Sequence, residues 1–164
     1  MRTGQIDAMA NLDPVIGTLL KENEVRVIAD TRTVADTKTI FGGNMPSACL
    51  YASEEFITKN PNTAQALANA IVRADKWIQA NDAETIAKTV PATYLLGDVE
   101  LYKQCLDANK EALSPDGLVD SDGPTTALNA LAAFVPNLDA SKIDISKIYT
   151  NEFADNANKK YPNV

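Results

Sequence analysis

The chain has 164 residues, 45% of them hydrophobic and 23% charged, and it carries a net charge of −7. This composition is typical of a globular protein with a sizeable core and argues against a disordered or fibrous chain. The acidic balance excludes nucleic acid as a partner, because affinity for phosphate backbones depends on Lys and Arg. The sequence also has no stretch of about 20 consecutive apolar residues, the length that a membrane-spanning helix requires.

The sequence contains no histidine, which removes the commonest metal ligand and the Ser-His-Asp and Cys-His forms of catalysis. The two cysteines, Cys49 and Cys105, are far apart and have no CxxC spacing, so a zinc or redox motif is not supported. Since both lie in apolar local patterns, we expect them to be buried free thiols. We expect no catalytic residue, no metal site and no cofactor in this chain, and thus a protein that is not an enzyme.

Along the first third of the chain, strand and helix patterns alternate. A short helix is predicted over 14–22, whereas 31–39 is polar and rich in Thr, and 41–46 has the Gly and Pro content of a loop. Three short runs rich in apolar and β-branched residues are predicted as strands: 6–12, 25–30 and 48–52. This alternation indicates an α/β sheet.

The remainder of the chain has a helical pattern, in which capping residues precede apolar stripes of period 3.6. Ser53, Asp82 and Asp98 are predicted N-caps, and Asn60 followed by Pro61 predicts the start of a long helix. The predicted helices are 53–60, 61–78, 82–90, 98–112, 124–135 and one that begins at 150. Because successive helices offer the three strands no partners, the sequence predicts a partial sheet lobe followed by a helical segment.

The loop Asn11-Leu12-Asp13-Pro14 is the first candidate binding site. In α/β sheets, ligands bind beyond the carboxyl ends of strands, where helix N-termini present free N–H groups. Asn11 and Asp13 occupy such a position, and the carboxylate of Asp13 suits a solute group that carries an ammonium or donates hydrogen bonds. The alternative is that Asp13 caps the following helix, with its carboxylate accepting backbone N–H bonds. The two roles are compatible.

The turn Gly42-Gly43-Asn44 is the second candidate. Two glycines allow the backbone to approach a ligand closely, and the alternative is a flexible crossover loop. The carboxylates of Asp120 and Asp122 lie in a run of turn residues that resembles a calcium loop. This run lacks the distal Glu at the expected spacing, so it is interpreted as a loop without metal.

Five segments, in order along nearly the whole chain, resemble the C-terminal half of ABC-importer solute-binding proteins of the nitrate/sulfonate/taurine type. They are Gly4-Gln5-Ile6-Asp7-Ala8, the helix and strand within 14–30, 46–56 with 60–61, 70–78, and 144–153. The resemblance implies a periplasmic-binding-protein-like type II α/β fold. Residues 1–44 then form part of the second lobe, and 45–164 return to the first lobe with the C-terminal helices. It also implies that the chain opens in the middle of a larger protein.

The resemblance implies a receptor that closes on a small organic or oxyanion solute in an interlobe cleft and delivers it to an ABC permease in the membrane. Such receptors are periplasmic, or extracytoplasmic and membrane-anchored. The resemblance places ligand contacts in the loop from Asn11 to Pro14, with Asp13 as the acid, and puts Gly43 and Asn44 near the hinge. The aromatic residue of the taurine-binding branch is absent from this loop, which argues against taurine itself.

Pyrimidine-precursor synthases of thiamin biosynthesis share this fold and provide the alternative from another functional class. These enzymes depend on an active-site histidine, and this sequence has none. Strands without partners present unpaired edges, which invite pairing with another chain. We therefore also expect a swapped or edge-paired oligomer of the chain.

Overall fold

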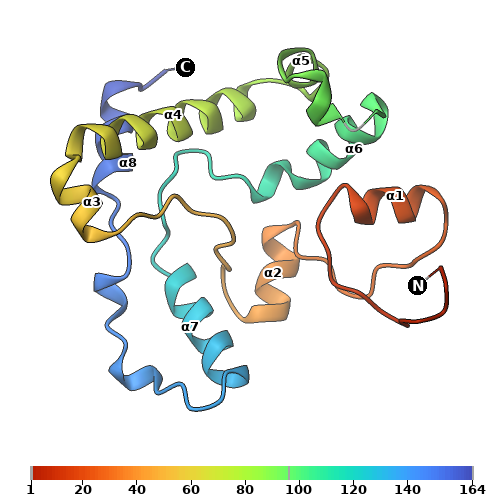
Figure 1. Cartoon of the computed structure of the whole chain (residues 1–164), viewed down its shortest axis with the longest axis horizontal. Helices are drawn as coiled ribbons and strands as arrows, with labels where there is room; N and C mark the ends of the chain where they lie inside the picture. The colour runs from red at the N-terminus through yellow and green to blue at the C-terminus, as the bar shows by residue number, and fades with distance from the viewer. Residues whose placement is uncertain (1, 96, 164) are drawn as a thin grey trace.

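The structure is a computed structural model of the chain that describes residues 2–95 and 97–163. Its helices are spread in an open arrangement rather than packed around one common core (Figure 1). The α-helices are α1 (Val15–Lys21), α2 (Val34–Phe41), α3 (Glu54–Lys59), α4 (Pro61–Ala80), α5 (Ala83–Thr89), α6 (Val99–Asn109), α7 (Gly123–Phe134) and α8 (Glu152–Lys160). Short 3₁₀ turns lie between them: η1 (Ala92–Leu95), η2 (Lys110–Ala112), η3 (Ala140–Lys142) and η4 (Ile145–Lys147).

The predicted α/β fold with a partial sheet lobe is wrong for this chain. No strand or sheet occurs in residues 2–95 and 97–163. The three predicted strands, 6–12, 25–30 and 48–52, are irregular, because a strand exists only where a second strand receives its backbone hydrogen bonds. No two of these segments pair within residues 2–95 and 97–163.

The helix predictions after residue 52 agree with the structure, and side-chain caps explain the agreement. The side chains of Ser53, Asp82 and Asp98 each accept a hydrogen bond from the backbone N–H three residues later. Such a bond satisfies one of the N–H groups that a helix start leaves without a partner. Asn60 differs, because its side-chain amide donates to the carbonyl of Phe56 in the preceding helix instead of capping α4.

Helix α2 was not predicted, because its Thr-rich sequence indicated a polar loop. The hydroxyl of Thr33 accepts a hydrogen bond from the backbone N–H of Asp36 and donates one to the carboxylate of the same residue. At the other end, Gly42 adopts φ +81°, the left-handed conformation that ends many helices and suits glycine. Thr33 with Asp36 at the start, and Gly42 at the end, were the sequence signals for this helix.

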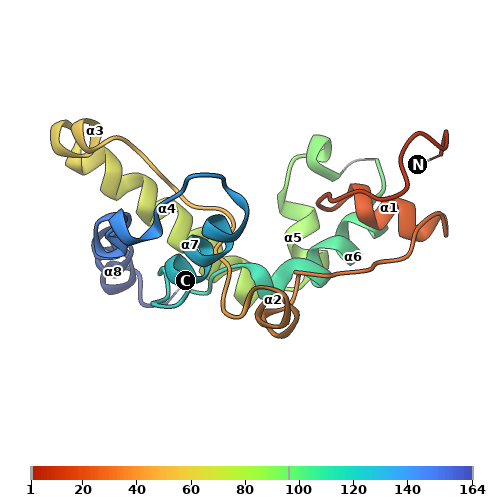
Figure 2. The same ribbon diagram turned by 90° about the horizontal axis from the view of Figure 1, so that it is seen from below.

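Two small cores hold the helices together. Helices α4 and α8 bury Val72, Ala154 and Ala157 against each other. Helices α5 and α6 pack separately, and α1 lies against α6. A Cβ atom added to Gly17 of α1 would come within 2.6 Å of the Cys105 sulfur, so glycine permits this close approach. Figure 2 shows α3, α4, α7 and α8 at one end of the molecule and α1, α5 and α6 at the other.

The prediction that both cysteines are buried is wrong for Cys49, which is exposed. Residues 48–52 are all exposed, so the sulfur of Cys49 is accessible to solvent. Cys105 is partly buried between α6 and α1, and both thiols are free. No helix in the described part of the chain is long and apolar enough to cross a membrane.

Candidate functional site

The carboxylate of Asp13 joins three segments that are distant in sequence. Its side chain is only 8% exposed. One carboxylate oxygen accepts a 2.9 Å hydrogen bond from the backbone N–H of Gly17, so Asp13, which lies one position before the N-cap residue Pro14, satisfies an N–H group of the first turn of α1. The other oxygen lies 2.6 Å from the side-chain amide of Asn109 in α6 and 3.4 Å from a guanidinium nitrogen of Arg32.

Arg32 connects Asp13 to a second carboxylate. Its Nη2 donates to Asp30 at 2.5 Å, its Nε lies 3.0 Å from both oxygens of that carboxylate, and its backbone N–H donates at 2.9 Å. The hydrogen bonds that the Arg32 side chain donates to Asp30 lower the pKa of the Asp30 carboxyl and raise the pKa of the guanidinium. We call Asp13, Asp30, Arg32 and Asn109 the Asp13 cluster. With two carboxylates and one guanidinium, it carries a formal charge of −1.

Sequence reasoning selected Asp13 but missed the other members of the Asp13 cluster. The spacing of Asp30 and Arg32, with the carboxylate two residues before the guanidinium, was a usable local signal for an ion pair. Asn109 gave no signal, because it lies 96 residues from Asp13 and reaches it only through the packing of α6 on α1.

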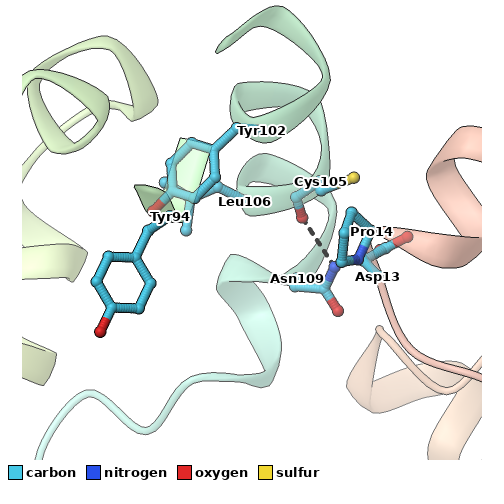
Figure 3. A pocket seen from close by; sticks show the side chains of 7 residues that line it. All are labelled: Asp13, Pro14, Tyr94, Tyr102, Cys105, Leu106 and Asn109. Carbon is cyan, nitrogen blue, oxygen red and sulfur yellow. Dashed lines mark hydrogen bonds between the residues drawn. The ribbon is translucent and has the colours of Figure 1, made fainter. Parts of the chain in front are cut away.

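A pocket of about 330 Å³ opens beside Asp13. This volume is at the lower end of the range for small-molecule sites. Two tyrosine rings lie on one side of the pocket, while Asp13, Pro14 and Asn109 lie on the other (Figure 3). Its lining residues come from the start of α1, from η1 and from α6: Asp13, Pro14, Tyr94, Tyr102, Cys105, Leu106 and Asn109.

The pocket combines apolar walls with a few polar groups. Asp13 contributes acceptor oxygens, and the two tyrosines contribute aromatic rings. Burial, and secondly the charge of Asp13, raise the pKa of the Cys105 thiol. Cys105 is therefore a poor nucleophile at neutral pH and acts here as an apolar wall.

The other three predicted site residues lie elsewhere. Asn11 is exposed, and its side-chain oxygen accepts a hydrogen bond from the backbone N–H of Leu12. Asn44 donates from its side-chain amide to Asp120 at 2.8 Å. The side-chain carbonyl oxygen of Asn44, Oδ1, is buried and has no hydrogen-bond partner within the described residues.

Gly43 faces α7. A Cβ atom at this position would lie 2.2 Å from the hydroxyl oxygen of Thr126. The Gly43–Asn44 turn thus packs on α7 and its preceding loop, whereas Asp13 packs on α6. Helix α2 separates the two places along the chain, and the pocket beside Asp13 includes neither Gly43 nor Asn44.

The loop around Asp120 is ordered by its own backbone. One oxygen of this carboxylate accepts hydrogen bonds from the N–H groups of Asp122 and Gly123, at 2.9 and 2.6 Å. Residues 2–95 and 97–163 contain no group of three or more Cys, Asp or Glu side chains placed to hold a metal ion.

Comparisons with known proteins give two matches. Residues 1–92 match the NMT1-like family. A solved structure of a protein from Bordetella bronchiseptica RB50 is 59% identical to this chain and superimposes with a TM-score of 0.94. The alignment covers 99% of this chain and 51% of that one, so this chain spans about half the length of the Bordetella protein. No curated protein matches the sequence.

Proposed function

The chain belongs to the NMT1-like family, which is of the nitrate/sulfonate/taurine solute-binding type. From this premise we propose that it is part of the substrate-binding component of an ABC importer. It corresponds in this proposal to the C-terminal half of such a receptor and captures a small organic or oxyanion solute. The chain contributes binding groups and no catalytic residue.

The observation that carries the proposal is the Asp13 carboxylate at the wall of the pocket. A carboxylate has about four lone-pair sites, and three donors already occupy those of Asp13, namely Gly17, Asn109 and Arg32. One acceptor site is therefore left for a solute group that donates a hydrogen bond, such as an ammonium.

The side-chain oxygen of Asn44 is a second acceptor without a hydrogen-bond partner in the described residues. It is buried, and such an oxygen is stabilised by any donor that reaches it. We place Gly43 and Asn44 at the hinge side of the binding cleft and Asn11 at its rim. The division of the chain at residue 44 into parts of two lobes belongs to the same proposal.

The proposal also covers the partner protein and the cellular location. The solute is delivered to an ABC permease in the membrane, and the protein is periplasmic or extracytoplasmic and membrane-anchored. The exposed irregular segments near α1 also favour a swapped or edge-paired oligomer, because unpaired backbone groups invite pairing between chains.

Titration calorimetry of the full-length receptor with taurine, an alkanesulfonate and nitrate tests the proposal. The present chain alone should bind weakly or not at all, because a cleft needs both walls. We expect at least one of these solutes to bind.

Asp13→Ala and Asn44→Ala should each weaken binding of a solute that donates a hydrogen bond, such as the ammonium of taurine, about 10- to 150-fold, the range for a lost hydrogen bond to a charged or buried group. Neither variant should weaken binding of nitrate or an alkanesulfonate, which carry no donor. Asp107→Ala, which removes an exposed carboxylate from the side of α6 that faces away from Cys105 and Asn109, serves as the control. If none of the solutes binds, or if both variants bind a solute with a donor as the parent does, the proposal is wrong.

A further inference from the structure

The pocket beside Asp13 has a negative wall. Of the seven described residues that line it, Asp13 is the one charged side chain, and none is Lys or Arg. The guanidinium of Arg32 lies 3.4 Å from Asp13, but it donates to Asp30 at 2.5 and 3.0 Å. Asp30 therefore already neutralises the charge of Arg32, and the charge of Asp13 is left to attract a positive group in the pocket.

The thiol of Cys105 reports the sign of the electrostatic potential in the same pocket. Burial raises the pKa of this thiol most, the charge of Asp13 raises it further, and the charge of Arg32 lowers it by less. A negative charge at the sulfur is thus disfavoured, and of the two neighbouring charges that of Asp13 prevails. A sulfonate or nitrate placed beside Cys105 would meet the same unfavourable potential.

The two helix ends at the pocket have the same preference. An oxyanion at the start of α1 would need its free N–H groups, but the carboxylate of Asp13 already accepts the N–H of Gly17 at 2.9 Å. Helix α6 contributes Leu106 and Asn109 from its last turn, where the helix dipole is negative and favours cations. Neither of these two helix ends therefore favours an oxyanion.

The remaining walls suit the organic part of a cation. The rings of Tyr94 and Tyr102 lie across the pocket from Asp13 and Pro14 (Figure 3). A cation is attracted to the face of an aromatic ring when it lies within about 6 Å of the ring centre. Pro14 and Leu106 provide apolar contacts for carbon atoms, and the pocket of about 330 Å³ has room for a small organic molecule.

We propose that this pocket binds the positively charged group of a small organic ammonium, held by the carboxylate of Asp13 and the rings of Tyr94 and Tyr102, and that it excludes oxyanion groups. The inference rests on the proposed function and narrows its solute class. An oxyanion group of the same solute, such as the sulfonate of taurine, lies outside this pocket. Family membership does not predict this preference, since nitrate and alkanesulfonates are anions.

Two thiol reagents of similar size and opposite charge test the sign of the pocket in the full-length receptor. Trimethylammonioethyl methanethiosulfonate is a cation, sulfonatoethyl methanethiosulfonate is an anion, and peptide mass spectrometry gives the rate of each at Cys105. We expect the cation-to-anion rate ratio at Cys105 to exceed that of free N-acetylcysteine amide at least about tenfold. An equal or smaller ratio, or a Cys105 that neither reagent modifies, would overturn the proposal.

Charge variants assign this preference to Asp13. Asp13→Asn preserves the shape of the side chain and should bring the rate ratio close to that of the free thiol. Asp107→Asn, which removes an exposed carboxylate from the other side of α6, should leave the ratio unchanged. Arg32→Gln removes the opposing cation and should raise the ratio, so the test does not depend on the folding of Asp13→Asn. A fall with Arg32→Gln, or a fall with Asp107→Asn as large as that with Asp13→Asn, would contradict the assignment.

Protection of Cys105 by two simple salts tests binding itself. At equal concentrations, n-butylammonium chloride should slow the modification of Cys105 and sodium n-butanesulfonate should not. Tyr94→Phe keeps the aromatic ring and should retain this protection, whereas Tyr94→Leu should weaken it about two- to fivefold. Protection by butanesulfonate, or by neither salt, would overturn the proposal. Calorimetric binding of an alkanesulfonate to a receptor whose Cys105 shows no cation preference would overturn this inference alone and leave the proposed function standing.

Discussion

The carboxylate of Asp13 accepts a 2.6 Å hydrogen bond from the side-chain amide of Asn109, 96 residues further along the chain. The same amide group also donates to the carbonyl of Cys105, one turn earlier in α6. This bond fixes the end of α6 against the start of α1, at the wall of the pocket. A buried carboxylate with several donors is costly to disturb, because its partners are left without acceptors.

Replacing Asp13 by Ala should destabilise the chain by about 2–3 kcal/mol. The substitution removes a helix cap, worth about 1 kcal/mol, and leaves the amide of Asn109 without its carboxylate partner, which costs about 1–2 kcal/mol more. Urea denaturation followed by circular dichroism measures the free energy of unfolding.

Asp107→Ala on α6 is the matched control, because the side chain of Asp107 is exposed. Surface substitutions of this kind change stability by less than about 0.5 kcal/mol. Equal unfolding midpoints for the Asp13 and Asp107 variants would contradict the structural role of Asp13.

The sequence predicted the helices well where a cap residue fixed their starts. Asp82 and Asp98 are such residues, and each accepts the hydrogen bond that the prediction assumed. Local signals of this kind lie within four residues and are therefore visible in a sequence. Helix α2 was missed because residues 31–39 were interpreted only as polar and rich in Thr, and the cap formed by Thr33 and Asp36 was not considered.

The sheet was predicted wrongly because strand formation depends on a partner that a local pattern does not contain. The run Val25-Arg26-Val27-Ile28 has strand propensity, yet in this chain nothing pairs with it. The same limit applies to the candidate site. Asp13 was found from its position before a helix, whereas Asn109 depends on tertiary packing and no local pattern indicates it.

Acid should weaken the contact between Arg32 and Asp30. The pKa of Asp30 is lowered from its ordinary value of 3.8, chiefly by side-chain hydrogen bonds from Arg32. A carboxylate with a lowered pKa in the folded state adds stability above its unfolded pKa, and this stability is lost as the pH falls through the folded value. The loss should therefore begin below about pH 4.

The variant Asp30→Asn cannot undergo this protonation. Melting temperatures measured between pH 5 and pH 2 should fall less steeply for Asp30→Asn than for the parent chain. Identical slopes would show that Asp30 and Arg32 do not interact in solution. Arg32→Gln provides the converse control, since it removes the guanidinium and should flatten the same part of the profile.

Cys49 should react with a thiol reagent about tenfold or more faster than Cys105 at pH 8. Cys49 is exposed, whereas burial and the charge of Asp13 raise the pKa of the Cys105 thiol and reduce its thiolate fraction. Time courses with a chromogenic disulfide on the single variants Cys49→Ser and Cys105→Ser assign the two rates. Asp13→Asn should accelerate Cys105 and leave Cys49 unchanged, and a slower or equal rate at Cys49 would contradict the exposures.

Gly43→Ala should destabilise the chain by about 1–3 kcal/mol, the usual cost of overpacking. The new Cβ would lie 2.2 Å from the hydroxyl oxygen of Thr126. This hydroxyl cannot move freely, because Thr126 is buried and donates a 3.1 Å hydrogen bond to the carbonyl of Asp122. Unfolding in urea measures the loss.

The double variant Gly43→Ala with Thr126→Ala tests whether the Thr126 hydroxyl is the source of the clash. Without the hydroxyl, the nearest Thr126 atom that remains is its Cβ, 3.5 Å from the added methyl, which is an ordinary contact. The double variant should therefore be more stable than the sum of the two single effects predicts, with a coupling energy of about 1 kcal/mol or more. Additive effects would show that the Thr126 hydroxyl is not what excludes a side chain at residue 43.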